Sequence, residues 1–134
     1  MPLVTIDLLR GRTPERLDAI SNAIHDAMVE LLEVPERDRF QIITEHEPPT
    51  LRFDPSYLDI PRGESFILIR VTLAQGRTTE AKRAFYRRLS QLLTDRAQIP
   101  AEDLAVIMIE NGREDWSFGR GQASYLELPR EAWR

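Results

Sequence analysis

The sequence predicts an α+β fold in which two helices cover one face of a single mixed sheet, giving a two-layer α/β sandwich. The first observation behind this prediction is an internal repeat: residues 11–45 align without a gap with residues 76–110, and nine of the 35 aligned positions are identical. The second is that apolar runs flank the helical stretch of each copy, so each half reads strand, helix, strand. A crossover of this length makes the two strands of each half parallel and right-handed.

The chain of 134 residues corresponds to one domain, with half-units at about residues 2–46 and 65–110 and a C-terminal tail at residues 111–134. A net charge of −4 gives no overall cationic field to attract nucleic acid or anionic lipid. The sequence has no cysteine, which excludes disulfides, thiol nucleophiles and thiolate metal sites. Because we find neither a signal-like start nor an apolar run of membrane-spanning length, we expect a cytoplasmic protein.

The first half begins with an apolar strand over residues 3–9. Gly11-Arg12-Thr13 then forms a turn and a helix N-cap, and Pro14 fits the first helical position, where its missing N–H costs nothing. Val34-Pro35 ends the helix, and a second strand covers residues 40–44. One apolar stripe runs along this helix at spacings of three and four residues: Leu17, Ile20, Ile24, Ala27, Met28 and Leu31.

The second half repeats this order. A strand over residues 66–73 leads into Gly76-Arg77-Thr78, Ile99-Pro100 ends the second helix, and the last strand covers residues 104–109. Between the halves, residues 46–65 hold five prolines and glycines and are predicted to form a connecting loop. The stripe of the second helix consists of Phe85, Leu89, Leu92 and Leu93.

Both predicted helices lie on the same face of the sheet, which leaves the other face uncovered. Because the residues on that face are also partly apolar, we expect a partner subunit to cover it. The tail is expected to be ordered, since aromatic residues are unusual in a disordered end. Those of the tail are Trp116, Phe118, Tyr125 and Trp133.

Pro2 is the first candidate for chemistry. Proline after Met1 permits removal of the initiator methionine, which leaves Pro2 as an amino terminus fixed at the start of a strand. Apolar surroundings or cations favour its neutral amine, a base or an iminium-forming nucleophile, whereas a nearby carboxylate favours the protonated form, an acid. The alternative is that Pro2 only begins a strand.

Pro2, the tandem strand-helix-strand units and the helix starts GRTPE and GRTTE together resemble the tautomerase superfamily. Within it, VPERDRF at residues 34–40 and DWSFG at residues 115–119 are similar to the malonate semialdehyde decarboxylase family, and the resemblance covers almost the whole chain. It implies a tautomerase-like homotrimer that binds a small carboxylate-bearing substrate. The implied reaction is decarboxylation of a 3-oxo acid such as malonate semialdehyde to acetaldehyde and carbon dioxide, with hydratase side activity on unsaturated acids.

The resemblance also implies residue roles. Pro2 would be the catalytic acid, Asp38 would handle water, and Arg77 would hold the substrate carboxylate. At residues 75–77 this chain has Gln75-Gly76-Arg77, whereas the better-known members of the family have a run that resembles Arg-Pro-Arg. This difference implies a variant branch of the family. There Gln75 would supply one neutral hydrogen bond to the substrate, about half as strong as a charged one.

Simpler interpretations stay open for the charged candidates. Arg77 starts a helix, where its guanidinium and the first N–H groups can face an anion, but its repeat mate Arg12 shows that the position can be structural. Without the resemblance, the residues favour a solvated loop carboxylate for Asp38, paired with neighbouring arginines, and its repeat mate is Asp103.

The remaining motifs concern a pocket cover, metal and cofactor binding, and a charged helix face. Trp116 and Phe118 are expected to cover a substrate pocket or to fill a gap under the tail. His25 and His46 lack the spacing of a zinc site and no glycine-rich phosphate loop is present, so we expect no metal and no cofactor. A basic stripe on the second helix is predicted to be a solvated face: Lys82, Arg83, Arg87 and Arg88.

Two other functions compete with decarboxylation. One is a tautomerase that uses neutral Pro2 as a general base, and the other is a non-catalytic oligomeric binding protein with the same fold.

Overall fold

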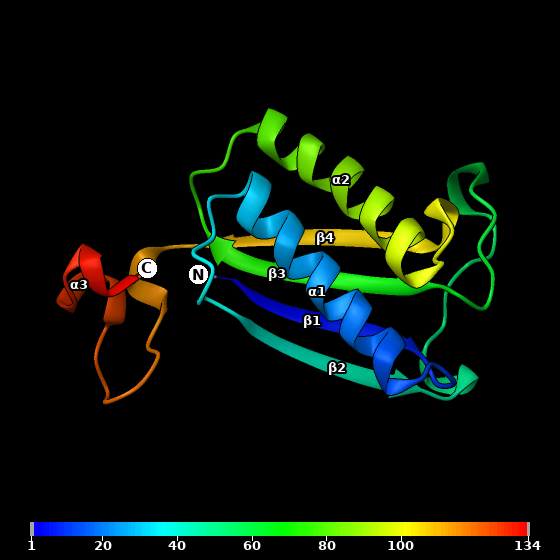
Figure 1. The fold of residues 1–134 in the computed structure, drawn as a ribbon, viewed down its shortest axis with the longest axis horizontal. Helices are drawn as coiled ribbons and strands as arrows, with labels where there is room; N and C mark the ends of the chain where they lie inside the picture. The colour runs from blue at the N-terminus through cyan, green and yellow to red at the C-terminus, as the bar shows by residue number, and fades with distance from the viewer. Residues whose placement is uncertain (1, 134) are drawn as a thin grey trace.

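The computed structural model describes residues 2–133 and contains a four-stranded sheet in the order β2-β1-β3-β4 (Figure 1). β1 (Leu3–Leu9) pairs in parallel with β2 (Phe40–His46), and β3 (Ile67–Ala74) pairs in parallel with β4 (Leu104–Asn111). The two halves join through the antiparallel pairing of β1 with β3. The predicted mixed sheet of two β-α-β units is confirmed.

The two long helices lie side by side on one face of this sheet (Figure 1). α1 (Pro14–Leu31) and α2 (Thr79–Ala97) begin as the sequence predicts, because the side chains of Thr13 and Thr78 each accept a hydrogen bond from a backbone N–H of the first turn. α1 ends before the predicted Val34-Pro35 stop, since the backbone turns left-handed at Glu33 with φ of 54°.

The core lies between the helices and the two central strands. Val4, Ile6 and Leu8 of β1 alternate inward and are fully buried, as are the inward residues of β3. The predicted apolar stripes of both helices pack onto them, with Phe85 the largest fully buried side chain. The helix-facing side of the sheet is therefore covered by the chain's own helices.

The opposite face of the sheet is not covered by the helices and is partly apolar. Four large side chains on its outer strands, Phe40, Ile42, Ile107 and Ile109, are 44% to 53% exposed. Thr5 and Arg70 of the central strands separate Ile42 from Ile107, so the apolar side chains form two exposed pairs on the same face. Exposed apolar side chains rimmed by polar ones are typical of a protein interface.

We expect Ile42→Asp combined with Ile107→Asp to convert the protein into monomers, because association would then bury carboxylates without partners. Light scattering after size exclusion measures the mass. Tyr86→Asp, at an exposed aromatic position on α2 (37% exposed), is the control and should leave the mass unchanged. An unchanged mass for the double sheet variant would contradict an interface on this face.

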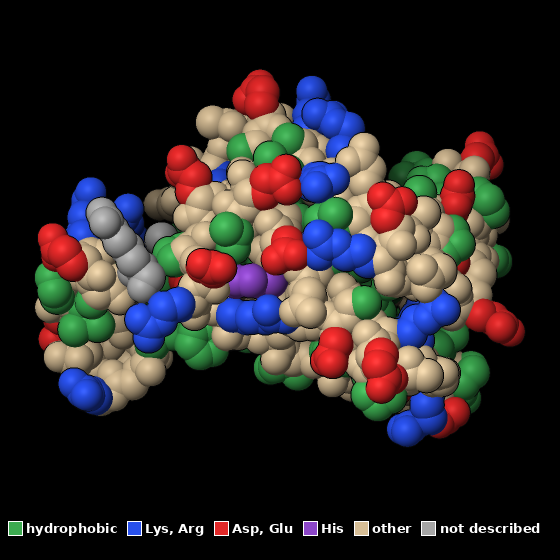
Figure 2. Space-filling view, viewed as in Figure 1, with side chains coloured by type: hydrophobic (Ala, Val, Ile, Leu, Met, Phe, Trp, Pro, Cys, Tyr) green, Lys and Arg blue, Asp and Glu red, His purple; other side chains and the backbone are tan. Residues whose placement is uncertain are grey.

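Charges are interspersed over the helical layer (Figure 2). Two members of the predicted basic stripe form ion pairs across elements, Lys82 with Glu110 and Arg88 with Glu30. These two charges of the stripe are thus neutralised locally, as is common on a solvated face. None of the described helices is long and apolar enough to cross a membrane.

The remaining chain lies at the two ends of the sheet (Figure 1). The segment between the halves contains two short 3-10 helices, η1 (Pro48–Thr50) and η2 (Tyr57–Asp59). The tail after β4 is ordered, as predicted, and folds into short helices beyond the end at which β1 begins, close to the amino terminus. These are η4 (Arg113–Asp115), α3 (Ser124–Glu127) and η5 (Arg130–Trp133).

Candidate active site

The predicted site residues gather at one end of the sheet. Because β1 runs parallel to β2 and antiparallel to β3, the start of β1 meets the start of β2 and the end of β3: Leu3 pairs with Phe40 on one side and Thr72 on the other. Pro2 is buried directly before Leu3. The strand pairing therefore holds Pro2 rigidly where three segments of the chain converge.

Asp38 is the second candidate at this end of the sheet. It precedes β2 by two residues, in a turn in which its N–H donates to the carbonyl of Pro35 at 3.0 Å. One of its carboxylate oxygens, Oδ2, accepts a hydrogen bond from the hydroxyl of Tyr125 at 3.3 Å. The register thus brings the carboxylate that the resemblance marks to the same end of the sheet as Pro2.

Tyr125 is a site residue that sequence reasoning did not identify. The sequence indicated only that an aromatic residue there helps to order the tail, and Asp38 is 87 positions away. The side chain is 9% exposed, and burial raises the pKa of Tyr125 to about 12, while the charge of Arg77 acts in the opposite direction. At neutral pH the phenol is therefore a protonated hydrogen-bond donor toward Asp38.

We expect the phenolate absorbance of the wild type minus that of Tyr125→Phe to rise only near pH 12. Below the ordinary pKa of 10 the buried neutral phenol contributes its full stability, and this contribution is lost as the pH rises through the folded value. The unfolding free energy of the wild type should therefore fall relative to Tyr125→Phe between pH 10 and 12. A difference spectrum with its midpoint near pH 10 would contradict the burial of this hydroxyl.

Arg77 follows β3 at this end and is half-buried. Its Nε donates to the carbonyl of Leu32 at 3.0 Å and its Nη1 to the carbonyl of Ala74 at 2.8 Å. Burial lowers the pKa of Arg77, opposed by the nearby charges of Glu33 and Glu110. Two of its nitrogens thus tie the end of α1 to the end of β3, which is the structural role that its repeat mate suggested.

Gln75 and Trp116 both contact Asn111 at the end of β4. The backbone N–H of Gln75 donates to the carbonyl of Asn111 at 2.8 Å, while its side chain is exposed. Trp116 donates its indole N–H to the side-chain oxygen of Asn111, also at 2.8 Å. These bonds fasten the beginning of the tail to the sheet.

Phe118 links the tail to the strands. Its ring stacks on Trp116 with centroids 5.5 Å apart, packs against Phe40 of β2 at 5.1 Å, and meets Tyr125 edge-on at 5.4 Å. Trp116 and Phe118 therefore belong to an aromatic cluster with Tyr125, whose hydroxyl donates to Asp38.

A cavity of about 220 Å³ lies under this cluster. Its polar groups include Asp38 and Tyr125, and its apolar wall includes Phe40, Phe118 and Trp133. The predicted site residues Pro2, Gln75, Arg77 and Trp116 are not among its lining residues, although they occupy the same end of the sheet. The volume suits a small organic acid, and the carboxylate beside a phenol donor suits proton transfer.

The described residues 2–133 contain no group of three or more histidine, aspartate or glutamate side chains placed to hold a metal ion. The titratable groups at this end of the sheet include the Asp38 carboxylate, the Tyr125 phenol and, once Met1 is removed, the nitrogen of Pro2.

Comparison with known proteins places this arrangement in a family. A family model described as a tautomerase enzyme matches residues 38–119, and a second with the same description matches residues 2–58. The chain is 40% identical over 127 residues to the probable tautomerase YusQ of Bacillus subtilis (strain 168), which covers 95% of this chain and 100% of that protein.

Solved structures also match this chain over most of its length. Two crystal structures of malonate semialdehyde decarboxylase superpose with TM-scores of 0.87, at 35% and 38% identity, and cover 92% of this chain and 95% and 94% of theirs. The first compares wild-type, mutant and inactivated forms as a basis for decarboxylase and hydratase activities, and the second is inhibited by 3-bromopropiolate. A fused 4-OT symmetric trimer shares the fold, with a TM-score of 0.74 at 24% identity over 90% of this chain and 94% of that one. With its tandem β-α-β units, its buried Pro2 and these matches over nearly its whole length, this chain belongs to the tautomerase superfamily.

Proposed function

We propose that this protein decarboxylates a small 3-oxo acid, such as malonate semialdehyde, without a cofactor, using Pro2 as an amino-terminal acid. The observation that carries the proposal is the Asp38 carboxylate, held by Tyr125 at 3.3 Å in a small aromatic cavity at the end of the sheet where Pro2 begins β1. The similarity to two malonate semialdehyde decarboxylases supports it.

The charge of the Asp38 carboxylate supports an acid role for Pro2. Removal of Met1 turns the nitrogen of Pro2 into a secondary amine, and a neighbouring carboxylate such as Asp38 favours its protonated form. Protonated Pro2 donates to the aldehyde oxygen of the substrate. The electrons of the bond between the carboxylate carbon and the α-carbon then form the enol double bond, carbon dioxide leaves, and the enol tautomerises to acetaldehyde.

An iminium route gives the same products. Neutral Pro2 attacks the aldehyde carbon, and the aldehyde oxygen takes up the amine proton and one proton from solvent and leaves as water. The resulting iminium accepts the electrons released with carbon dioxide. Hydrolysis of the enamine that remains, after its protonation, releases acetaldehyde and regenerates Pro2. Borohydride, which reduces an iminium to a stable amine, distinguishes this route from simple proton donation.

We assign binding of the substrate carboxylate to Arg77 and Gln75. Because backbone carbonyls occupy two nitrogens of Arg77, its contribution is mainly its positive charge at this end of the sheet rather than a complete guanidinium fork. The exposed amide of Gln75 adds a neutral donor. Trp116 and Phe118 exclude water from the carboxylate, which favours loss of its charge.

Hydratase activity follows from the same groups. Asp38, oriented by Tyr125, would position a water for addition to an activated unsaturated acid. We also propose that the chain assembles as a homotrimer, as the fused 4-OT neighbour does, through the uncovered sheet face.

A tautomerase that uses neutral Pro2 as a base is the second candidate, and the name of the relative YusQ favours it. The purified protein is assayed with malonate semialdehyde for carbon dioxide, with an enolisable 2-oxo acid for ketonisation, and with an alkynoic acid for hydration. Carbon dioxide release with the highest kcat/KM supports the decarboxylase. Faster ketonisation would support the tautomerase, and no turnover of the three acids would support a binding protein.

A further inference from the structure

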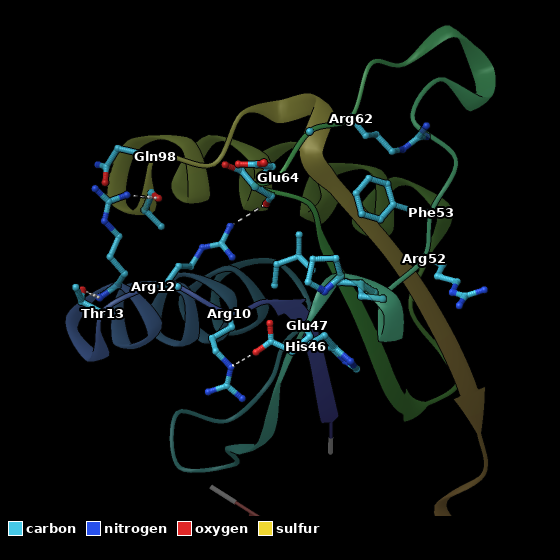
Figure 3. A pocket seen from close by; sticks show the side chains of 18 residues that line it. Arg10, Arg12, Thr13, His46, Glu47, Arg52, Phe53, Arg62, Glu64 and Gln98 are labelled. Atoms are coloured by element: carbon cyan, nitrogen blue, oxygen red, sulfur yellow. Dashed lines mark hydrogen bonds and ion pairs between the residues drawn. The ribbon is translucent and has the colours of Figure 1, made fainter.

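A second cavity, of about 1060 Å³, lies at the end of the sheet opposite Pro2 (Figure 3). It is bounded by the end of β1, the start of α1, the end of α2 and the segment between the two halves. None of the residues that line this cavity was assigned a part in the reaction proposed at the Pro2 end.

The internal repeat explains why a site-like arrangement recurs here. Because β1 and β3 are antiparallel, the two copies of the Gly-Arg-Thr turn lie at opposite ends of the sheet. Arg12 occupies the position in this cavity that Arg77 occupies near Pro2, and Asp103 corresponds to Asp38. The contacts are similar in kind: Arg12 donates through Nη2 to the carbonyl of Ser65 at 2.9 Å, and buried Asp103 accepts from the N–H of Gly63 at 2.7 Å.

The lining of this cavity is cationic in a chain of net charge −4. It includes five arginines and two glutamates. One glutamate, Glu47, forms a 2.8 Å ion pair with Arg10. Positive charge in excess of the two carboxylates is therefore concentrated in a concave surface, where it attracts anions.

Arg12 and Arg16 are the central pair. Figure 3 shows Arg12 reaching from the turn before α1 toward the segment that precedes β3. Arg16 donates through Nη1 to the carbonyl of Ala97 at the end of α2, at 3.1 Å. Burial lowers the pKa of Arg12, the like charge of Arg16 lowers it further, and Asp103 opposes both. An anion bound between the two guanidinium groups would relieve this repulsion.

The cavity also offers apolar surface. Phe53 stacks on Phe66 with centroids 4.2 Å apart, and Figure 3 shows its ring between the helices and the segment that carries Arg52. Leu9 and Leu51 line the same cavity. A ligand with a carbon skeleton between its charged groups fits this combination better than a bare inorganic ion.

We infer that this cavity is a second anion site, which binds a small polycarboxylate between Arg12 and Arg16 without transforming it. The residue that corresponds to Pro2 in the second half is Ile67, whose nitrogen is a peptide amide inside β3 and cannot titrate. The inference does not depend on the reaction at the Pro2 end.

Titration calorimetry with citrate, performed on the intact oligomer at low salt, tests the inference. We expect Arg16→Gln to weaken citrate binding about tenfold, because one charge-assisted interaction is lost. Its backbone contact is a single bond at a helix end, so the variant should fold, and its thermal unfolding midpoint checks this. Arg83→Gln on the exposed face of α2 removes the same charge and should leave the affinity unchanged.

Asp38→Asn separates this site from the one near Pro2 and should also leave citrate binding unchanged, whether or not the enzyme turns over any substrate. Inorganic phosphate should bind more weakly than citrate, because it cannot use the apolar wall. The inference is overturned if citrate does not bind, if Arg83→Gln weakens binding as much as Arg16→Gln, if Asp38→Asn abolishes it, or if phosphate binds as tightly as citrate.

Discussion

Replacing Pro2 with alanine should lower kcat/KM for decarboxylation by about 10²- to 10⁴-fold, the range expected for loss of a positioned general acid. Alanine leaves a primary amine that rotates freely about its bond to Cα, whereas the proline ring holds the nitrogen at one angle at the start of β1. Carbon dioxide release from malonate semialdehyde measures the effect.

Pro14→Ala is a matched control for this variant. Pro14 is an exposed proline at the first position of α1, at the opposite end of β1 from Pro2, and its replacement should leave kcat/KM unchanged. Intact mass must show that Met1 is absent from all three proteins, because an acylated Pro2 has no titratable nitrogen. Undiminished carbon dioxide release by Pro2→Ala would refute the catalytic role of Pro2.

Replacing Asp38 with asparagine should lower kcat/KM roughly 10²-fold and change the pH dependence of the remaining activity. Asparagine keeps an oxygen that can accept the Tyr125 hydroxyl, so the fold of the tail should persist while the negative charge is lost. Without that charge the protonated amine of Pro2 is less stable and its pKa falls. The descending alkaline limb of the pH–rate profile should therefore move to lower pH.

Glu36→Gln is the matched control, since Glu36 is an exposed carboxylate two positions before Asp38 and outside the small cavity. It should alter neither kcat/KM nor the position of the alkaline limb. If Asp38→Asn lowers the rate without moving that limb, Asp38 orients the substrate or water but does not control the charge on Pro2.

Much of the fold could be predicted from local signals. The Gly-Arg-Thr turns, the apolar stripes and the alternation within the strands correctly indicated two helices, four strands and parallel pairing within each half. The strand ends were less well predicted: β2 continues to His46 and β4 to Asn111, two residues beyond the apolar runs. The last residue of each extension, His46 or Asn111, pairs with Leu9 or Ala74, and such pairing depends on the neighbouring strand rather than on local composition.

The candidate site could be predicted less completely from the sequence than the fold. Pro2 and Asp38 could be selected because a resemblance marked their motifs, and the register of β1 and β2 brings them to the same end of the sheet. Tyr125 carried no signal of its own, since its role arises from a tail that folds beyond the end of the sheet and contacts Asp38 there. Likewise, no local pattern indicates that the guanidinium of Arg77 contacts the carbonyls of Leu32 and Ala74.

The sequence by itself determined the two β-α-β units, the uncovered apolar face and the position of Pro2 at the start of a strand, because periodicity and capping act over a few residues. Only the tertiary structure decided which polar groups meet. The antiparallel pairing of β1 with β3 places Asp38 and Arg77 at one end of the sheet, and their repeat mates Asp103 and Arg12 at the other. Contacts between residues this distant in sequence depend on packing of the whole domain, and that packing separates a candidate catalytic end from an arginine-lined cavity.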